Sequence, residues 1–225
     1  MGRVVDLGGR GRGYLASPEK GAGPALLVIQ EYWGLVPHIE DVCERFAIEG
    51  FTALAPDLFR GAVASEPDEA GKLMMSLNLD QAADDLGAAV GHLAGSPAVR
   101  GEGVGVVGFS MGGGLALMLS TTRPMDIRAC VCFYGLIPWP AAAPDWSRLR
   151  APVQGHFAEQ DEFFSIDRME ELEARFGVLG KDAEFFRYPG VGHAFFNDTR
   201  SDAYDETAAS MAWTRTLEFL RAKLG

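Results

Sequence analysis

Cysteine is scarce in this chain, with three residues among 225. So small and odd a number cannot supply a disulfide framework of the kind that holds small secreted domains together. Cys130 and Cys132 lie two apart in an apolar stretch, where a strand would put both on one face, and we expect buried thiols. No metal-ligand or dinucleotide motif is present, so the sequence predicts neither a metal nor a cofactor. No secretory signal opens the chain, and we expect a cytoplasmic protein.

Long hydrophobic runs and an excess of positive charge are also missing. No apolar run approaches the roughly 18 residues of a membrane span, and we expect no membrane association. The 31 acidic residues outnumber the 20 basic ones, which gives a net charge of −11. Because such a surface repels phosphate backbones, nucleic acid is excluded as an expected partner. The partner that remains is a small molecule, bound by a monomer or a homodimer.

Short apolar strands alternate with amphipathic helices along the whole chain. The expected strands cover residues 25–29, 52–55, 104–107, 127–133, 153–157 and 184–188. The expected helices cover residues 39–47, 79–93, 113–119, 169–176 and 209–224, with a surface connection at 61–78. Near-continuous apolar strands separated by helices are typical of a parallel sheet covered on both faces. No linker or repeat divides the chain, so residues 1–225 are expected to form a single doubly wound α/β domain.

The strongest chemical signal is the pentapeptide Gly108-Phe109-Ser110-Met111-Gly112. It follows an expected strand and precedes an expected helix, which is the setting that a nucleophile elbow requires. The flanking glycines allow the tight turn, and the helix N-terminus offers backbone N–H groups beside the hydroxyl. The alternative is a glycine-rich turn with an idle serine. The setting favours Ser110 as a nucleophile.

A serine hydroxyl needs a base, and in this arrangement the order along the chain is nucleophile, acid, histidine. His156 lies inside an expected strand and is expected to pack there, whereas His193 lies in the loop after the last strand. We therefore expect His193 to be the base. For the acid that orients it, Asp161 lies just after a strand, with Glu159 and Glu162 as alternatives.

These residues, together with Gln30-Glu31-Tyr32-Trp33-Gly34, resemble the dienelactone hydrolase family. The resemblance runs from about residue 25 to residue 224 and implies the α/β-hydrolase fold. It further implies hydrolysis of esters or lactones by a cysteine–histidine–aspartate triad. Glu31 takes the place of a glutamate that meets the nucleophile in the resting enzyme. The N–H groups of Tyr32 and Met111 take the place of the oxyanion hole.

The sequence departs from the family pattern in two ways. Serine stands at position 110 instead of cysteine, which predicts a serine esterase, and Glu31 either hydrogen-bonds the serine or caps a loop. The arginines that hold the substrate carboxylate in the family are also missing, because Asn197 occupies one position and residues 66–78 contain no arginine. Arg60 and Arg200 are nearby in sequence without matching the pattern. We therefore expect uncharged esters to be better substrates than dienelactone.

Aromatic residues flank the predicted acid and base. Such side chains usually belong to the core, but Trp33, Phe163 and Phe196, with Asn197 beside them, are candidates for the substrate-binding wall. The sequence thus predicts a serine hydrolase of small carboxylic esters or lactones that works through an acyl-enzyme. Two alternatives remain open: a thioesterase or acyl-peptide hydrolase with the same triad, and a ligand-binding protein on this fold without turnover.

Overall fold

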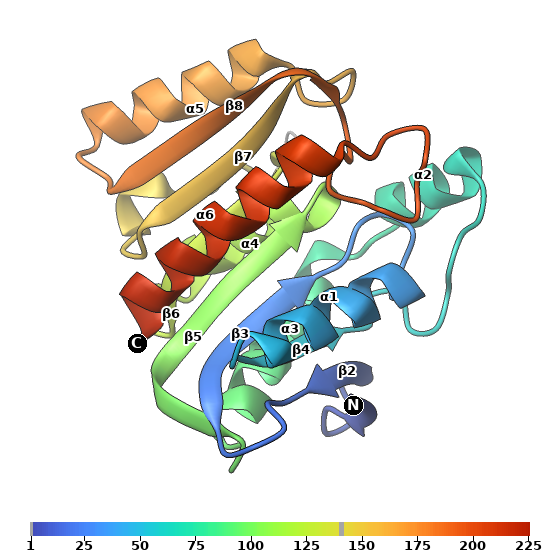
Figure 1. Ribbon diagram of the computed structural model, residues 1–225, viewed down its shortest axis with the longest axis vertical. Helices are drawn as coiled ribbons and strands as arrows, with labels where there is room; N and C mark the ends of the chain where they lie inside the picture. Colours follow the sequence, from blue (N-terminus) through green and yellow to red (C-terminus); the bar gives the residue numbers. More distant parts are fainter. Residues whose placement is uncertain (1, 140–141) are drawn as a thin grey trace. The chain divides into compact units, whose positions relative to one another are not determined.

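The computed structural model describes residues 2–139 and 142–225, in which strands and helices alternate (Figure 1). The strands are β1 (Arg3–Asp6), β2 (Arg12–Ala16), β3 (Gly23–Ile29), β4 (Thr52–Pro56), β5 (Val99–Phe109), β6 (Ile127–Phe133), β7 (Val153–Gln160) and β8 (Ala183–Gly192). The helices are α1 (Pro37–Ile48), α2 (Pro67–Met75), α3 (Leu79–Ala94), α4 (Met111–Thr122), α5 (Ile166–Val178), α6 (Glu206–Leu224) and the 3₁₀ helix η2 (Trp146–Arg148).

The strand order is β1-β2-β4-β3-β5-β6-β7-β8. The pairs β3–β4, β6–β7 and β7–β8 are parallel, whereas β1–β2 and β2–β4 are antiparallel. This mainly parallel sheet with its helices confirms the predicted fold class. The chain divides into two compact units, Met1–Val106 with Leu224 and Val107–Lys223 with Gly225. The predicted single domain over residues 1–225 stays a prediction.

The first unit is built around two strands whose residues are all buried, β3 and β4. Continuous burial agrees with their apolar sequences, because a parallel strand is covered on both faces. Figure 1 shows α1 in front of β4 and α3 behind it. Both helices contact β3 and β4. The loop after β3 contains Glu31, Tyr32 and Trp33, and the loop after β4 contains Arg60.

In the second unit, helices cover both faces of β7 and β8 (Figure 1). Phe185 of β8 contacts Phe176 of α5, with ring centroids 5.9 Å apart. The next residue, Phe186, lies under the guanidinium of Arg215 from α6, 4.1 Å from its ring centroid. Because successive side chains of a strand point to opposite faces, α5 and α6 lie on opposite sides of β8.

A buried polar network joins α6 to this sheet. His156 of β7 is fully buried, and its Nδ1 lies 2.8 Å from the hydroxyl of Tyr188. Its Nε2 lies 3.1 Å from both Gln154 Oε1 and Thr216 Oγ1, the latter from α6. Burial and then the positive charge of Arg215 lower the pKa of His156 to about 3. The prediction that His156 packs inside its strand is confirmed.

The structure also contains elements that the sequence did not predict. The strands β1 and β2 pair antiparallel at one edge of the sheet, and their flanking glycines hide any clear alternation. Helix α2 occupies part of the segment predicted as a surface connection. Cys130 and Cys132 are buried free thiols, as predicted, and Cys43 is also buried and free.

Candidate active site

Ser110 lies between β5 and α4 in a strained turn. Its backbone has φ 53° and ψ −118°, a region that residues with a side chain rarely adopt. Its N–H donates to the carbonyl of Phe133 at 2.9 Å. Gly108 is required beside it, because a Cβ there would overlap the carbonyl of Gly112. These features are those of the predicted elbow.

A second glycine, Gly135, supports the turn from the end of β6. A Cβ on Gly135 would overlap the carbonyl oxygen of Ser110, so the two backbones approach more closely than any side chain allows. The thiol of Cys132 in β6 donates a hydrogen bond to the carbonyl of Gly135, which anchors the segment after β6 to the strand. Sequence reasoning missed Gly135, for which the only signal was a glycine two residues after an apolar strand.

Three predicted residues of the second unit form a continuous hydrogen-bonded chain. Ser110 Oγ lies 2.8 Å from His193 Nε2, and His193 Nδ1 lies 2.7 Å from Asp161 Oδ2. The side chain of Asp161 is 2% exposed and that of His193 is 14% exposed. The buried carboxylate of Asp161 can hold the partly exposed imidazole of His193 through Nδ1, so that Nε2 of the ring faces Ser110.

The other oxygen of Asp161 is also occupied. Oδ1 accepts the backbone N–H of Phe163 at 2.8 Å and that of Phe164 at 2.9 Å. These two donors fix the rotation of the carboxylate, so that Oδ2 faces His193.

The alternative acids have other surroundings. Glu159 accepts the backbone N–H of Gly190 at 3.0 Å, and Glu162 is exposed. Among the candidates from the sequence, the geometry therefore favours Asp161 as the partner of His193.

Aromatic rings surround the imidazole of His193. Tyr134 contacts it edge-on at 5.1 Å between ring centroids, Phe164 lies at 5.9 Å, and Phe163 lies at 4.8 Å. Tyr134 is fully buried with a φ of 34°, and sequence reasoning missed it. Phe163 is 63% exposed, so it offers an apolar surface beside His193 and stays a candidate for substrate contact.

Two predicted substrate-binding residues are buried. Phe196 is 2% exposed and stacks on Phe109 and Trp213, with centroid distances of 5.4 and 5.9 Å. Asn197 is also 2% exposed, and its Oδ1 accepts the backbone N–H of Thr199 at 3.1 Å. Both side chains are buried, and the substrate contacts expected for Phe196 and Asn197 stay predictions.

The remaining predicted site residues are described unit by unit. Met111 is fully buried and begins α4, where a backbone N–H has no acceptor within the helix. In the first unit, Glu31 is 1% exposed, and the rings of Tyr32 and Trp33 meet edge-on at 4.6 Å. The roles predicted for Glu31, Tyr32 and Trp33 beside Ser110 stay predictions.

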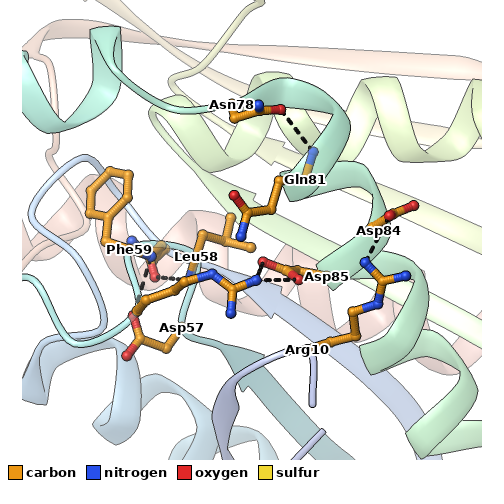
Figure 2. Close-up of polar contacts among 10 residues, drawn as sticks. Arg10, Asp57, Leu58, Phe59, Asn78, Gln81, Asp84 and Asp85 are labelled. Carbon is orange, nitrogen blue, oxygen red and sulfur yellow. Dashed lines mark hydrogen bonds and ion pairs between the residues drawn. The ribbon is translucent and has the colours of Figure 1, made fainter. Parts of the chain in front are cut away.

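The two arginines near the family's carboxylate-binding positions are engaged in ion pairs. Arg60 Nη2 lies 3.0 and 2.9 Å from the two carboxylate oxygens of Asp85, whose side chain is 3% exposed. Figure 2 shows Asp85 and Gln81 on the same helix, α3. Arg200 Nη2 lies 2.8 Å from Asp202. Each guanidinium thus has a carboxylate of its own.

The described residues offer neither a membrane-spanning helix nor a metal-binding cluster. Within residues 2–139 and 142–225, no helix is both long enough and apolar enough to cross a membrane. The same ranges contain no group of three or more histidine, cysteine or acidic side chains placed to hold a metal ion.

Comparisons with known proteins agree on one family. A family model described as "Dienelactone hydrolase family" matches residues 12–224. The protein named usf from Aquifex pyrophilus is 37% identical over 233 residues, which cover 100% of both chains. A protein of Aquifex aeolicus (strain VF5), provisionally named a carboxymethylenebutenolidase, is 34% identical with the same coverage. A crystal structure of a provisionally named dienelactone hydrolase from Klebsiella pneumoniae subsp. pneumoniae is 26% identical, with a TM-score of 0.89 and 98% of each chain covered.

Proposed function

The chain belongs to the dienelactone hydrolase family of carboxylic ester hydrolases, and from this we propose that it cleaves small carboxylic esters or lactones with Ser110, His193 and Asp161. One observation carries the proposal: the unbroken hydrogen-bonded chain from Ser110 Oγ through His193 to Asp161, with distances of 2.8 and 2.7 Å. The family model spans both compact units, which supports the further proposal that residues 1–225 act as a single domain.

In the first half of the proposed reaction, Ser110 Oγ attacks the ester carbonyl while His193 Nε2 accepts its proton. The carbonyl π electrons move to the oxygen and form a tetrahedral oxyanion. Asp161 stabilises the imidazolium that results, because its Oδ2 accepts the hydrogen bond from Nδ1. Collapse of the intermediate breaks the bond to the alcohol, which takes the proton from His193. An acyl-enzyme on Ser110 remains.

The second half repeats these steps with water as the nucleophile. His193 accepts a proton from water, the hydroxide attacks the acyl carbonyl, and the proton returns to Ser110 as the acid leaves. We propose an oxyanion contact from the backbone N–H of Met111, and the contact from Tyr32 stays a prediction from the family resemblance. The N–H of Met111 is at the start of α4, where the partial positive charge of a helix favours an anion.

For the substrate, we propose an uncharged acyl group. Arg60 and Arg200, which could meet a substrate carboxylate, already pair with Asp85 and Asp202, and the exposed ring beside His193 is that of Phe163. A missing charge-assisted contact lowers kcat/KM by about tenfold to a hundredfold. Short neutral esters should therefore have a higher kcat/KM than dienelactone, and a tenfold preference for dienelactone would contradict this proposal.

The proposed nucleophile can be tested with a fluorophosphonate probe followed by p-nitrophenyl acetate turnover. The wild type should be labelled on Ser110, located by peptide mass spectrometry, and should hydrolyse the ester. Ser110→Ala should do neither, whereas Ser165→Ala, which changes an exposed serine, should match the wild type. A wild type without label or turnover would instead indicate a ligand-binding protein. Faster turnover of acyl thioesters than of esters would indicate a thioesterase.

A further inference from the structure

Phe163 places an exposed aromatic ring beside the proposed base. Its ring centroid lies 4.8 Å from that of His193, and the two ring planes are tilted by 54°. Of the other rings described around the imidazole, Tyr134 is fully buried and Phe164 is 7% exposed, whereas Phe163 is 63% exposed. A phenyl ring that stays in water forgoes the free energy that its burial would contribute. Its apolar surface is therefore available to a molecule bound next to His193.

The short segment between β7 and α5 holds this ring in place. The N–H of Phe163 donates to Asp161 Oδ1 at 2.8 Å, and the N–H of Phe164 donates to the same oxygen at 2.9 Å. The buried ring of Phe164 lies 5.6 Å from the guanidinium carbon of Arg168 in α5. The backbone of Phe163 is thus anchored on the same carboxylate that orients His193.

The chemistry at His193 determines which part of a substrate reaches the ring of Phe163. In the first half of the proposed reaction, the imidazole gives its proton to the leaving alcohol, so the alcohol oxygen lies within hydrogen-bond reach of Nε2. The carbon body of the alcohol is bonded to that oxygen and therefore lies next to the imidazole. The acyl carbon, in contrast, is bonded to Ser110 Oγ. The exposed ring is thus placed to contact the alcohol part of an ester.

We propose that Phe163 forms a subsite for apolar alcohols, and that the protein transfers its acyl group to such an alcohol in competition with water. This inference rests on the proposed function, because it needs the acyl-enzyme on Ser110. Release of an alcohol and attack by an alcohol follow the same path in opposite directions, so a site that favours one favours the other. An aromatic alcohol suits this subsite best, because aromatic rings attract one another beyond the area that they bury.

The transfer step needs no reactant besides the acyl-enzyme and the alcohol. His193 Nε2 accepts the hydroxyl proton while the alcohol oxygen attacks the acyl carbonyl on Ser110. The carbonyl π electrons move to the oxygen and return when the tetrahedral intermediate collapses. The bond from the carbonyl carbon to Ser110 Oγ then breaks, and Oγ takes the proton from His193. A new ester leaves, and the free enzyme is restored.

The experiment is a competition between two alcohols for one acyl-enzyme. The protein turns over p-nitrophenyl acetate with benzyl alcohol and methanol present at equal concentrations, and NMR measures benzyl acetate, methyl acetate and acetate, with Ser110→Ala as the blank. The wild type should form benzyl acetate. Phe163→Ala should lower the ratio of benzyl acetate to methyl acetate about tenfold, because methanol has no apolar body to contact the ring. Damage to the triad slows both transfers alike, so a merely structural role of Phe163 would leave this ratio unchanged.

Two matched variants test the assignment to the aromatic ring. Phe163→Tyr keeps a ring and should keep the wild-type ratio. Val178→Ala changes an apolar residue of α5 that is 84% exposed, and it should also keep that ratio. The inference is overturned, while the proposed hydrolysis stands, if the wild type forms acetate without benzyl acetate or if Phe163→Ala keeps the wild-type ratio. A wild type that forms neither acetate nor ester above the blank would refute the proposed function, and this inference with it.

Discussion

Replacing Asp161 by asparagine should move the ring hydrogen of neutral His193 from Nδ1 to Nε2. In the wild type, Oδ1 accepts two backbone N–H groups while Oδ2 accepts from His193 Nδ1. An asparagine must keep its oxygen toward the two backbone donors, so its NH₂ faces His193. The imidazole then accepts at Nδ1 and carries its hydrogen on Nε2, where it can no longer receive the proton of Ser110.

The expected fall in kcat follows from this change of tautomer. The fold and the substrate contacts are kept, so KM should change little while kcat falls by roughly two to four orders of magnitude. At about 1.4 kcal/mol per factor of ten, this corresponds to about 3 to 6 kcal/mol of transition-state stabilisation.

Two measurements check this reasoning. Steady-state kinetics with p-nitrophenyl acetate give kcat and KM, and 15N NMR of the His193 ring reports which nitrogen carries the hydrogen. Glu162→Gln is the matched control, because this exposed neighbour should leave both readouts unchanged. If Asp161→Asn keeps more than about a tenth of kcat, or if Nδ1 stays protonated, Asp161 does not have the role assigned to it here.

Three further predictions concern the triad, the elbow and the buried histidine. Ser110→Ala and His193→Ala should each remove nearly all esterase activity, and the double variant should be no slower than either single one in a kcat comparison. Gly135→Ala should lower both the thermal midpoint and kcat, because its Cβ would overlap the Ser110 carbonyl. The control Gly177→Ala has no atom within 4 Å of its Cβ, so in the same melting experiment it should be as stable as the wild type or slightly more stable. The pKa of His156 falls from 6.5 to about 3 on folding, so its contribution to stability is complete above pH 6.5 and is lost toward pH 3. The free energy of unfolding in urea should therefore fall by up to about 1.4 kcal/mol per pH unit across that window, and His156→Gln should lack this part of the slope.

Much of the fold could be predicted because six of its strands, β3 to β8, contain an apolar run. The strand predicted over residues 127–133 matches β6 residue for residue, since each of its ends is bounded by polar or turn-forming residues. The start of β5 was missed because residues such as Arg100 and Glu102 are charged, and their place in a strand comes from backbone pairing rather than from an apolar pattern. Antiparallel β1 and β2 were missed for the same reason.

Some residues of the candidate site could be predicted from the sequence, and others could not. The positions of Ser110, Asp161 and His193 beyond the ends of three strands could be predicted because each comes shortly after an apolar run in the sequence. The roles of Phe196 and Asn197 are less constrained by the sequence, because a loop residue next to a reactive histidine can face either the substrate or the core. The supporting roles of Tyr134 and Gly135 depend on a close approach of two segments that no pattern along one chain records.

The buried hydrogen bonds of His156 have a consequence for how the C-terminal part of the molecule moves. Thr216 on α6 shares Nε2 of that imidazole with Gln154 of the sheet, so α6 cannot detach without leaving polar atoms unpaired in the core. A terminal helix ordinarily frays and exchanges its amide hydrogens through small local openings. The amides around Thr216 should instead exchange only when the whole second unit unfolds, and the last helix of the chain would then be among its slowest-exchanging segments.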